Sequence, residues 1–178
     1  MLSSCLWSCR MIIFDFDLTL VNSEPLEHLR MHGKWSAVMA RISEIEAYSG
    51  IEELLFDLHE RNQILAIVTK SPSMVPSKFI ELNNWPIGIV IGYHQVKRGQ
   101  HKPKPDALHK AMQKAGVADE KSFHVGDKPE DTQAARAAKV TAIGAGWGLD
   151  DTRDLEASAP DYLFTTVSQI RDFFEQVL

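Results

Sequence analysis

Two aspartates, Asp15 and Asp17, follow an apolar run and lie two positions apart. In an extended strand alternate side chains share one face, so these carboxylates can converge on one small volume. Carboxylates held this close repel each other unless a cation or a shared proton compensates, and Mg²⁺ is the natural oxygen-binding cation. One carboxylate could also attack phosphorus to give an aspartyl-phosphate while the second, as a carboxylic acid, protonates the leaving oxygen. A solvated strand-to-loop transition would explain the same two residues.

Further polar residues follow other apolar segments of the chain. Thr69 comes directly after the apolar run 64–68 (ILAIV), and Asp127 comes directly after 122–126 (SFHVG). Lys102 and Lys104 stand in HKPKPD, where two prolines stiffen the backbone and limit the movement of the loop. A lysine fixed beside an aspartyl nucleophile would offset carboxylate repulsion and bind phosphoryl oxygens, and a threonine hydroxyl would add a neutral donor.

Some of the polar residues in this pattern also have an ordinary structural explanation. Thr69 could simply complete a turn at the end of a strand. Asp131, four positions after Asp127, could complement the N-terminus of a helix instead of orienting a cation or a lysine. His94, His101 and His124 lack metal-ligand spacing and are expected to be surface or strand residues.

The elements that must position these groups alternate along the chain. Apolar runs predict strands at 11–14, 64–68, 87–91, 122–125, 140–143 and 162–164. Amphipathic spacing predicts helices at 51–61, 73–82, 106–115, 130–138 and 167–177. This alternation indicates an α/β fold: a three-layer, Rossmann-like parallel sheet with helices on both faces. Such sheets bind ligands at the carboxyl ends of their strands.

The ordered set DFDLT (15–19), IVTKS (67–71), HKPKPD (101–106) and VGDKPED (125–131) resembles the motifs of the haloacid dehalogenase superfamily of phosphohydrolases. The resemblance covers residues 11 to about 165. It implies a Rossmann-like sheet, bound magnesium and an aspartyl-phosphate intermediate.

Carried over position by position, the resemblance makes Asp15 the nucleophile and a metal ligand. Asp17 would be the general acid/base, and its main-chain carbonyl would also contact the metal. Asp127 would be the metal-ligating acid, with Asp131 supporting it.

The resemblance also assigns the groups that would bind substrate. Thr69 would be the hydroxyl of the second motif. Lys102 would be the third-motif lysine, because it directly precedes the first proline of the pair, and Lys104 is expected to contact substrate. Lys70 is a further substrate-binding candidate that stands where many relatives carry asparagine, and Lys128 replaces a common small hydroxyl residue.

The region between the first two motifs departs from the family pattern. Residues 20–50 have room for at most two short helices, and 72–100 have no room for a separate cap domain. We therefore expect an N-terminal tail at 1–10 and one catalytic domain at 11–178, with a minimal cap-position segment at about 20–50. An open site would suit a bulky phosphorylated substrate, or a small one enclosed by a second subunit.

Composition excludes several classes of protein. The chain has 178 residues, 44% of them hydrophobic, and a formal charge of −5, which argues against general nucleic-acid binding. No apolar stretch approaches a membrane span. The two cysteines, Cys5 and Cys9, can complete neither a zinc site nor a convincing disulfide framework, and the leader is expected to be a dispensable tail rather than a secretory signal. We expect a cytoplasmic protein whose oligomeric state the sequence leaves open.

The sequence therefore predicts a magnesium-dependent phosphomonoester hydrolase acting through Asp15 on a small or macromolecular phosphorylated substrate. A phosphomutase would use the same groups, although it usually needs an enclosed site. A binding or regulatory protein that keeps the fold without turnover is the alternative from another class.

Overall fold

The computed structural model describes residues 10–118 and 122–178. The expected tail, with Cys5 and Cys9, lies outside the described residues except for Arg10. Among the residues described, no helix is both long and apolar enough to cross a membrane.

Strands and helices alternate along most of the chain, as expected. The order is β1 (Met11–Phe14), β2 (Val21–Asn22), η1 (Glu24–Leu26), α1 (Glu27–Met31), α2 (Trp35–Ala40), η2 (Ile42–Glu44), β3 (Glu46–Ala47), α3 (Ile51–Glu60), β4 (Ile64–Val68), α4 (Met74–Asn83), β5 (Ile89–Ile91), η3 (Tyr93–Gln95), α5 (Asp106–Ala115), β6 (Ser122–Gly126), α6 (Pro129–Ala138), β7 (Thr141–Ala145), α7 (Arg153–Ala157), β8 (Tyr162–Phe164) and α8 (Val167–Val177).

One parallel sheet forms the centre of the protein. In the described part of the chain it has six strands in the order β5-β4-β1-β6-β7-β8, and every neighbouring pair is parallel. The apolar strand β1 lies between β4 and β6, so the residues that follow these three strands emerge side by side.

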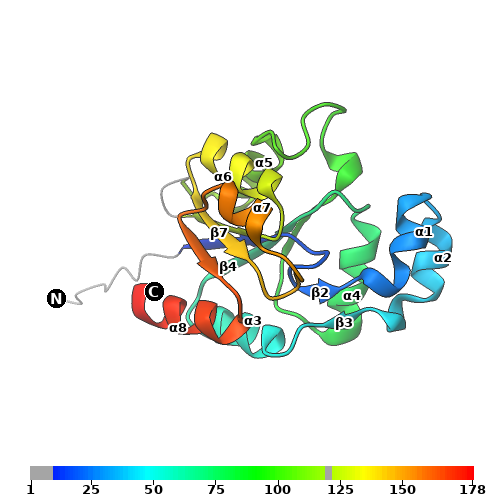
Figure 1. The fold of residues 1–178 in the computed structure, drawn as a ribbon, viewed down its shortest axis with the longest axis horizontal. Helices are drawn as coiled ribbons and strands as arrows, with labels where there is room; N and C mark the ends of the chain where they lie inside the picture. Colours follow the sequence, from blue (N-terminus) through cyan, green and yellow to red (C-terminus); the bar gives the residue numbers. More distant parts are fainter. Residues whose placement is uncertain (1–9, 119–121) are drawn as a thin grey trace.

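Helices cover both faces of this sheet, with α3 and α8 on one side and α5 and α6 on the other (Figure 1). Successive residues of β1 enter different cores because side chains alternate across a strand. Ile12 and Phe14 pack in the core that includes residues of α3 and α8. Met11 and Ile13 pack against residues of α5 and α6. The predicted three-layer α/β architecture is therefore confirmed.

The predicted elements match the observed bounds to within one residue at each end except in two strands, where the differences have local causes. The strand expected at 87–91 is shorter because its pairing with β4 begins only at Ile89. The strand expected at 140–143 runs from Thr141 to Ala145. The amide of Val140 still donates to a carbonyl of α6, and pairing with β8 continues through Ala145.

The segment between the first two motifs contains two short α-helices, as expected. Gly33, which has φ +63°, separates α1 from α2. Strands β2 and β3 bracket this segment as a two-stranded antiparallel ribbon. Neither the ribbon nor α7 was predicted, because elements this short have no periodic hydrophobic pattern.

Candidate active site

The polar residues expected to converge do so at one edge of the sheet. Asp15 follows β1, Thr69 follows β4 and Asp127 follows β6. These three strands are neighbours, so their carboxyl ends bring the three side chains together. All three residues are buried.

Lys102 reaches this edge from the loop between β5 and α5. Its Nζ lies 3.0 Å from Asp15 Oδ1 and 2.5 Å from Asp131 Oδ1, and it donates to the carbonyl oxygen of Val68 at 3.1 Å. The ammonium group of Lys102 thus has one hydrogen bond to a carbonyl and ion pairs with two carboxylates. Burial alone would lower the pKa of Lys102, but Asp131 and Asp15 raise it above its usual value. Lys102 is therefore a fixed positive charge beside Asp15.

Asp131 holds the lysine rather than pointing into the pocket. Its Oδ1 also lies 3.2 Å from His124 Nε2, and its Oδ2 accepts the backbone N–H of Lys128 at 3.1 Å. Burial would raise the pKa of Asp131, but Lys102 and then His124 hold it well below its usual value. Gly126 makes room for this arrangement, since a Cβ there would collide with the Asp131 side chain.

The Asp127 carboxylate forms no ion pair with any described residue, unlike those of Asp15, Asp17 and Asp131. Thr19 Oγ1 donates to its Oδ1 at 3.3 Å, while its buried Oδ2 has no hydrogen-bond partner among the described residues. Burial, followed by the charges of Asp15 and Asp131, raises the pKa of Asp127 to about 8. Burial likewise raises the pKa of Asp15, against the opposing charge of Lys102.

This crowding fits a bound cation. Carboxylate oxygens of Asp15, Asp127 and Asp131 lie within 4.8 Å of one another. Both oxygens of Asp131 are already engaged by Lys102, His124 and a backbone amide. Asp15 and Asp127 are thus the side chains best placed to hold a hard, oxygen-binding cation such as Mg²⁺.

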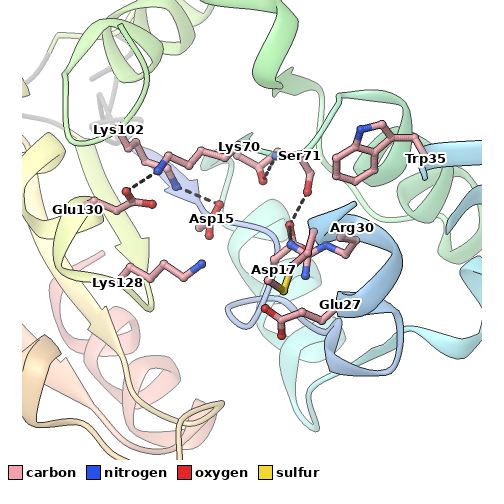
Figure 2. A pocket seen from close by; sticks show the side chains of 12 residues that line it. Asp15, Asp17, Glu27, Arg30, Trp35, Lys70, Ser71, Lys102, Lys128 and Glu130 are labelled. Atoms are coloured by element: carbon pink, nitrogen blue, oxygen red, sulfur yellow. Dashed lines mark hydrogen bonds and ion pairs between the residues drawn. The ribbon is translucent and has the colours of Figure 1, made fainter. Parts of the chain in front are cut away.

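The Asp17 carboxylate lies apart from that cluster and has partners of its own. Arg30 Nη2 lies 2.7 Å from Asp17 Oδ2, and Ser71 Oγ donates to the same oxygen at 2.7 Å. The two aspartates of the first motif thus line the same pocket with different partners, because Asp15 is paired with Lys102 and Asp17 with Arg30 (Figure 2).

Thr69 both completes a turn and borders the site. Its Oγ1 accepts the backbone N–H of Ser71 at 3.1 Å, which is the ordinary structural role considered for a strand-end threonine. The hydroxyl proton remains available as a donor toward the pocket that Thr69 lines.

A pocket of about 410 Å³ opens over these groups. It is lined by Asp15, Asp17, Glu27, Arg30, Met31, Trp35, Thr69, Lys70, Ser71, Lys102, Lys128 and Glu130. Four of these residues belong to the segment expected at about 20–50, so that segment forms part of the pocket wall.

The predicted substrate-binding lysines have different positions. Lys70 lines the pocket, where its Nζ lies 2.5 Å from Glu130 Oε2 (Figure 2). Lys104 is exposed and is not among the residues that line this pocket. Trp147 does not line this pocket; it donates from Nε1 to the Thr19 carbonyl at 2.8 Å and so supports the loop after β1.

Sequence reasoning missed Arg30, Ser71 and His124. Nothing in the pattern around Arg30 or Ser71 indicates a contact with Asp17. His124 does lie in a strand as expected, but its ring is buried and contacts Asp131. The sequence did offer one indication of the role of His124, because it is a titratable residue within a segment, SFHVG, that is expected to be a buried strand.

Comparison with known proteins identifies the family. The model of the haloacid dehalogenase-like hydrolases matches residues 27–145, which is more than half of the chain. The protein belongs to this family. The resemblance of its motifs to those phosphohydrolases is thereby confirmed.

Curated relatives include phosphatases of small phosphorylated compounds. A phosphoglycolate phosphatase of Photobacterium profundum is 28% identical over 162 residues, covering 85% of this chain and 69% of the relative. Pyrophosphatase PpaX of Oceanobacillus iheyensis is 29% identical over 128 residues, covering 71% of this chain and 59% of the relative. The match extends over only 42% of a Pseudomonas putida phosphoglycolate phosphatase. The chain thus spans between 42% and 69% of the length of these relatives.

Solved structures confirm the fold over nearly the full chain. A hydrolase from Pseudomonas syringae has a TM-score of 0.74 at 22% identity, covering 94% of this chain and 99% of that one. A haloacid dehalogenase-like hydrolase from Streptococcus pneumoniae has a TM-score of 0.73 at 20% identity, covering 93% and 98%.

Proposed function

We propose that the protein is a magnesium-dependent phosphomonoester hydrolase that forms an aspartyl-phosphate on Asp15. The observation that carries this proposal is the buried Asp15 carboxylate, which lines the pocket while Lys102 lies 3.0 Å away. Asp127 Oδ2, which has no hydrogen-bond partner among the residues that the structure describes, supports a cation beside it. Family membership supports hydrolysis as the class of reaction.

The proposed first step transfers the phosphoryl group to the protein. An Asp15 carboxylate oxygen attacks phosphorus, the bond from phosphorus to the ester oxygen breaks, and protonated Asp17 gives its proton to that leaving oxygen. Lys102 and Thr69 would bind the phosphoryl oxygens as negative charge builds on them. Bound Mg²⁺, held by Asp15, Asp127 and the main-chain carbonyl of Asp17, would supply further neutralisation of that charge.

The proposed second step releases phosphate. Asp17, now ionised, takes a proton from a water molecule, whose oxygen attacks phosphorus and displaces the Asp15 carboxylate. Inorganic phosphate leaves and both aspartates return to their starting states, so the two steps together consume one ester and one water.

The named relatives and the pocket favour a small, anionic substrate. Phosphoglycolate and pyrophosphate each carry a second anionic group beyond the phosphoryl group that would be transferred. Arg30 and Lys70 are paired with carboxylates. The Lys128 side chain forms no ion pair with any described residue, although its charge opposes the raised pKa of Asp127. Lys128 lines the pocket and is available for such a group.

Phosphate release from phosphoglycolate, pyrophosphate, sugar phosphates, nucleotides and 4-nitrophenyl phosphate, with Mg²⁺ or with chelator, tests the proposal. The Asp15→Asn protein is the control, since it keeps the shape of the side chain but removes the nucleophile. Turnover that requires Mg²⁺ and disappears in Asp15→Asn would support the proposal. Wild-type-like turnover in the variant would overturn the nucleophile assignment, and no turnover of any ester would favour a binding protein.

A further inference from the structure

Arg30 belongs to the short segment at about 20–50 that follows the first motif, and its charged side chain reaches the proposed catalytic groups. It lies in α1, outside the central sheet, yet its Nη2 reaches Asp17 Oδ2 at 2.7 Å. Only 16% of its side chain is exposed. Its other terminal nitrogen, Nη1, donates to Ser23 Oγ at 2.8 Å.

The backbone that carries Arg30 is fixed on both sides. Leu26 and Leu29 are buried in the main core, so they hold η1 and α1 against the domain. The amide of Gly33 donates to the Arg30 carbonyl at 3.0 Å and closes the end of α1. The guanidinium is therefore presented to Asp17 from an ordered support rather than from a free loop.

Two donors from different elements engage the same oxygen of Asp17. Arg30 comes from α1 and Ser71 comes from the loop after β4, and both contact Oδ2 (Figure 2). The other oxygen, Oδ1, is buried and has no hydrogen-bond partner among the described residues. Asp17 itself lines the pocket beside Asp15.

We infer that Arg30 is a positioning residue that, together with Ser71, holds Asp17 by Oδ2 and leaves Oδ1 to exchange a proton with the leaving group. This inference rests on the proposed function, because it assumes that Asp17 is the general acid. A segment too small to be a separate cap domain thus contributes directly to the orientation of the acid. Misplacement of an acid by about 1 Å can cost on the order of 100-fold in rate.

The test compares two esters that differ in their need for a proton. An alkyl phosphate has a poor leaving group that must be protonated, whereas 4-nitrophenolate leaves without a proton. The quantity to measure is kcat/KM, because it reports the steps through departure of the leaving group and not the later hydrolysis of the aspartyl-phosphate.

Arg30→Gln should lower kcat/KM for the alkyl ester by roughly 10- to 100-fold, with a change of less than about threefold for the aryl ester. Arg30→Lys, which keeps the charge but not the planar fork, should recover part of the loss. Arg41→Gln is the matched control. Arg41 belongs to the same segment, but its partner is the exposed Glu44 at 2.6 Å, so both kcat/KM values should stay unchanged.

Other outcomes overturn the inference in distinguishable ways. An equal loss with both esters in a folded Arg30→Gln protein would assign Arg30 to phosphate binding or to general support of the fold. An unchanged alkyl-to-aryl ratio in Arg30→Lys and Arg30→Gln would exclude the positioning role. A wild-type protein that hydrolyses neither ester would overturn the proposed function itself, and the inference with it.

Discussion

Lys102 is anchored more closely to Asp131 than to the proposed nucleophile. Its Nζ lies 2.5 Å from Asp131 Oδ1 and 3.0 Å from Asp15 Oδ1, and the Lys102 and Asp131 side chains are each only 3% exposed. Asp131 in turn is fixed by His124 and by the backbone amide of Lys128. The charge beside Asp15 is thus positioned by a buried chain of contacts that begins in β6 and α6.

We predict that Lys102→Met will lower kcat by at least about 100-fold, because a preorganised positive charge at the phosphoryl site is lost. The substitution also leaves two buried carboxylates without their partner, at a cost of about 3–5 kcal/mol in the free energy of unfolding. Steady-state kinetics and chemical denaturation measure these two effects.

Lys104→Met is the matched control for that experiment. Lys104 lies two positions away in the same loop but is exposed and outside the pocket lining, so kcat and stability should change little. A comparable loss of kcat in Lys104→Met would contradict this prediction and would support the sequence-based expectation that Lys104 contacts substrate.

The raised pKa of Asp127 predicts how stability changes with pH in metal-free protein. Asp127 has a pKa of about 8 in the folded protein against an ordinary value of 3.8, chiefly because it is buried. Between these values the folded state retains a proton that the unfolded state has lost. The stabilising contribution of protonated Asp127 is therefore present at low pH and is lost as the pH rises toward about 8. The pKa of Asp131 is shifted in the opposite direction, so Asp131 changes the pH dependence of stability only below its ordinary pKa of 3.8.

The temperature at the midpoint of thermal unfolding should therefore decrease as the pH is raised from 5.5 to 8.5 in the presence of chelator. Mg²⁺ should reduce this decrease, because it favours the ionised carboxylate. Asp127→Asn should show a shallower dependence in chelator and little response to Mg²⁺. A wild-type midpoint that rises over this range in chelator, or an Asp127→Asn protein with the full Mg²⁺ response, would contradict the assignment.

Sequence patterns predicted the central strands of the sheet because β1 and β6 are buried on both faces and β4 and β7 nearly so. The bounds of β1, β4 and β8 were obtained correctly from apolar runs that end at polar or turn residues. The convergence of Asp15, Thr69 and Asp127 followed from a general property of parallel sheets, whose carboxyl ends share one edge. No knowledge of side-chain geometry was needed for these predictions.

Contacts between side chains from separate elements were beyond the reach of these patterns. The pairing of Arg30 with Asp17 depends on where α1 packs, and α1 is too short to show a helical period of its own. The ion pair between Lys70 and Glu130 joins residues 60 positions apart, and its geometry depends on the loops after β4 and β6. These positions follow from tertiary packing, which a single sequence does not specify.

Lys128 is predicted to select substrates that carry a second anionic group. Its ammonium lines the pocket without an ion-pair partner among the described residues. Lys128→Gln should therefore raise KM for phosphoglycolate by roughly fivefold, the effect of losing about 1 kcal/mol from a solvent-accessible charge pair. Hydrolysis of 4-nitrophenyl phosphate, which has no second anionic group, is the internal reference. An equal rise in KM for both esters would place Lys128 at the transferred phosphoryl group instead.

Gly126→Ala should inactivate the protein by displacing Asp131. A Cβ at this position would collide with the Cβ and carboxylate atoms of Asp131, which have little freedom because they hold Lys102 and His124. We expect kcat to fall by about 100-fold or more as the Lys102 ammonium loses its anchor.

Gly88→Ala is the control for adding one methyl group near the sheet. A Cβ at Gly88 meets no atom within 4 Å, so activity and the unfolding midpoint should stay close to those of the wild type. Circular dichroism and a crystal structure of Gly126→Ala would show whether the sheet is retained while the contact of Lys102 with Asp131 lengthens. Full activity in Gly126→Ala would show that Asp131 can move without displacing Lys102, and the buried chain of contacts would then not be what positions the lysine.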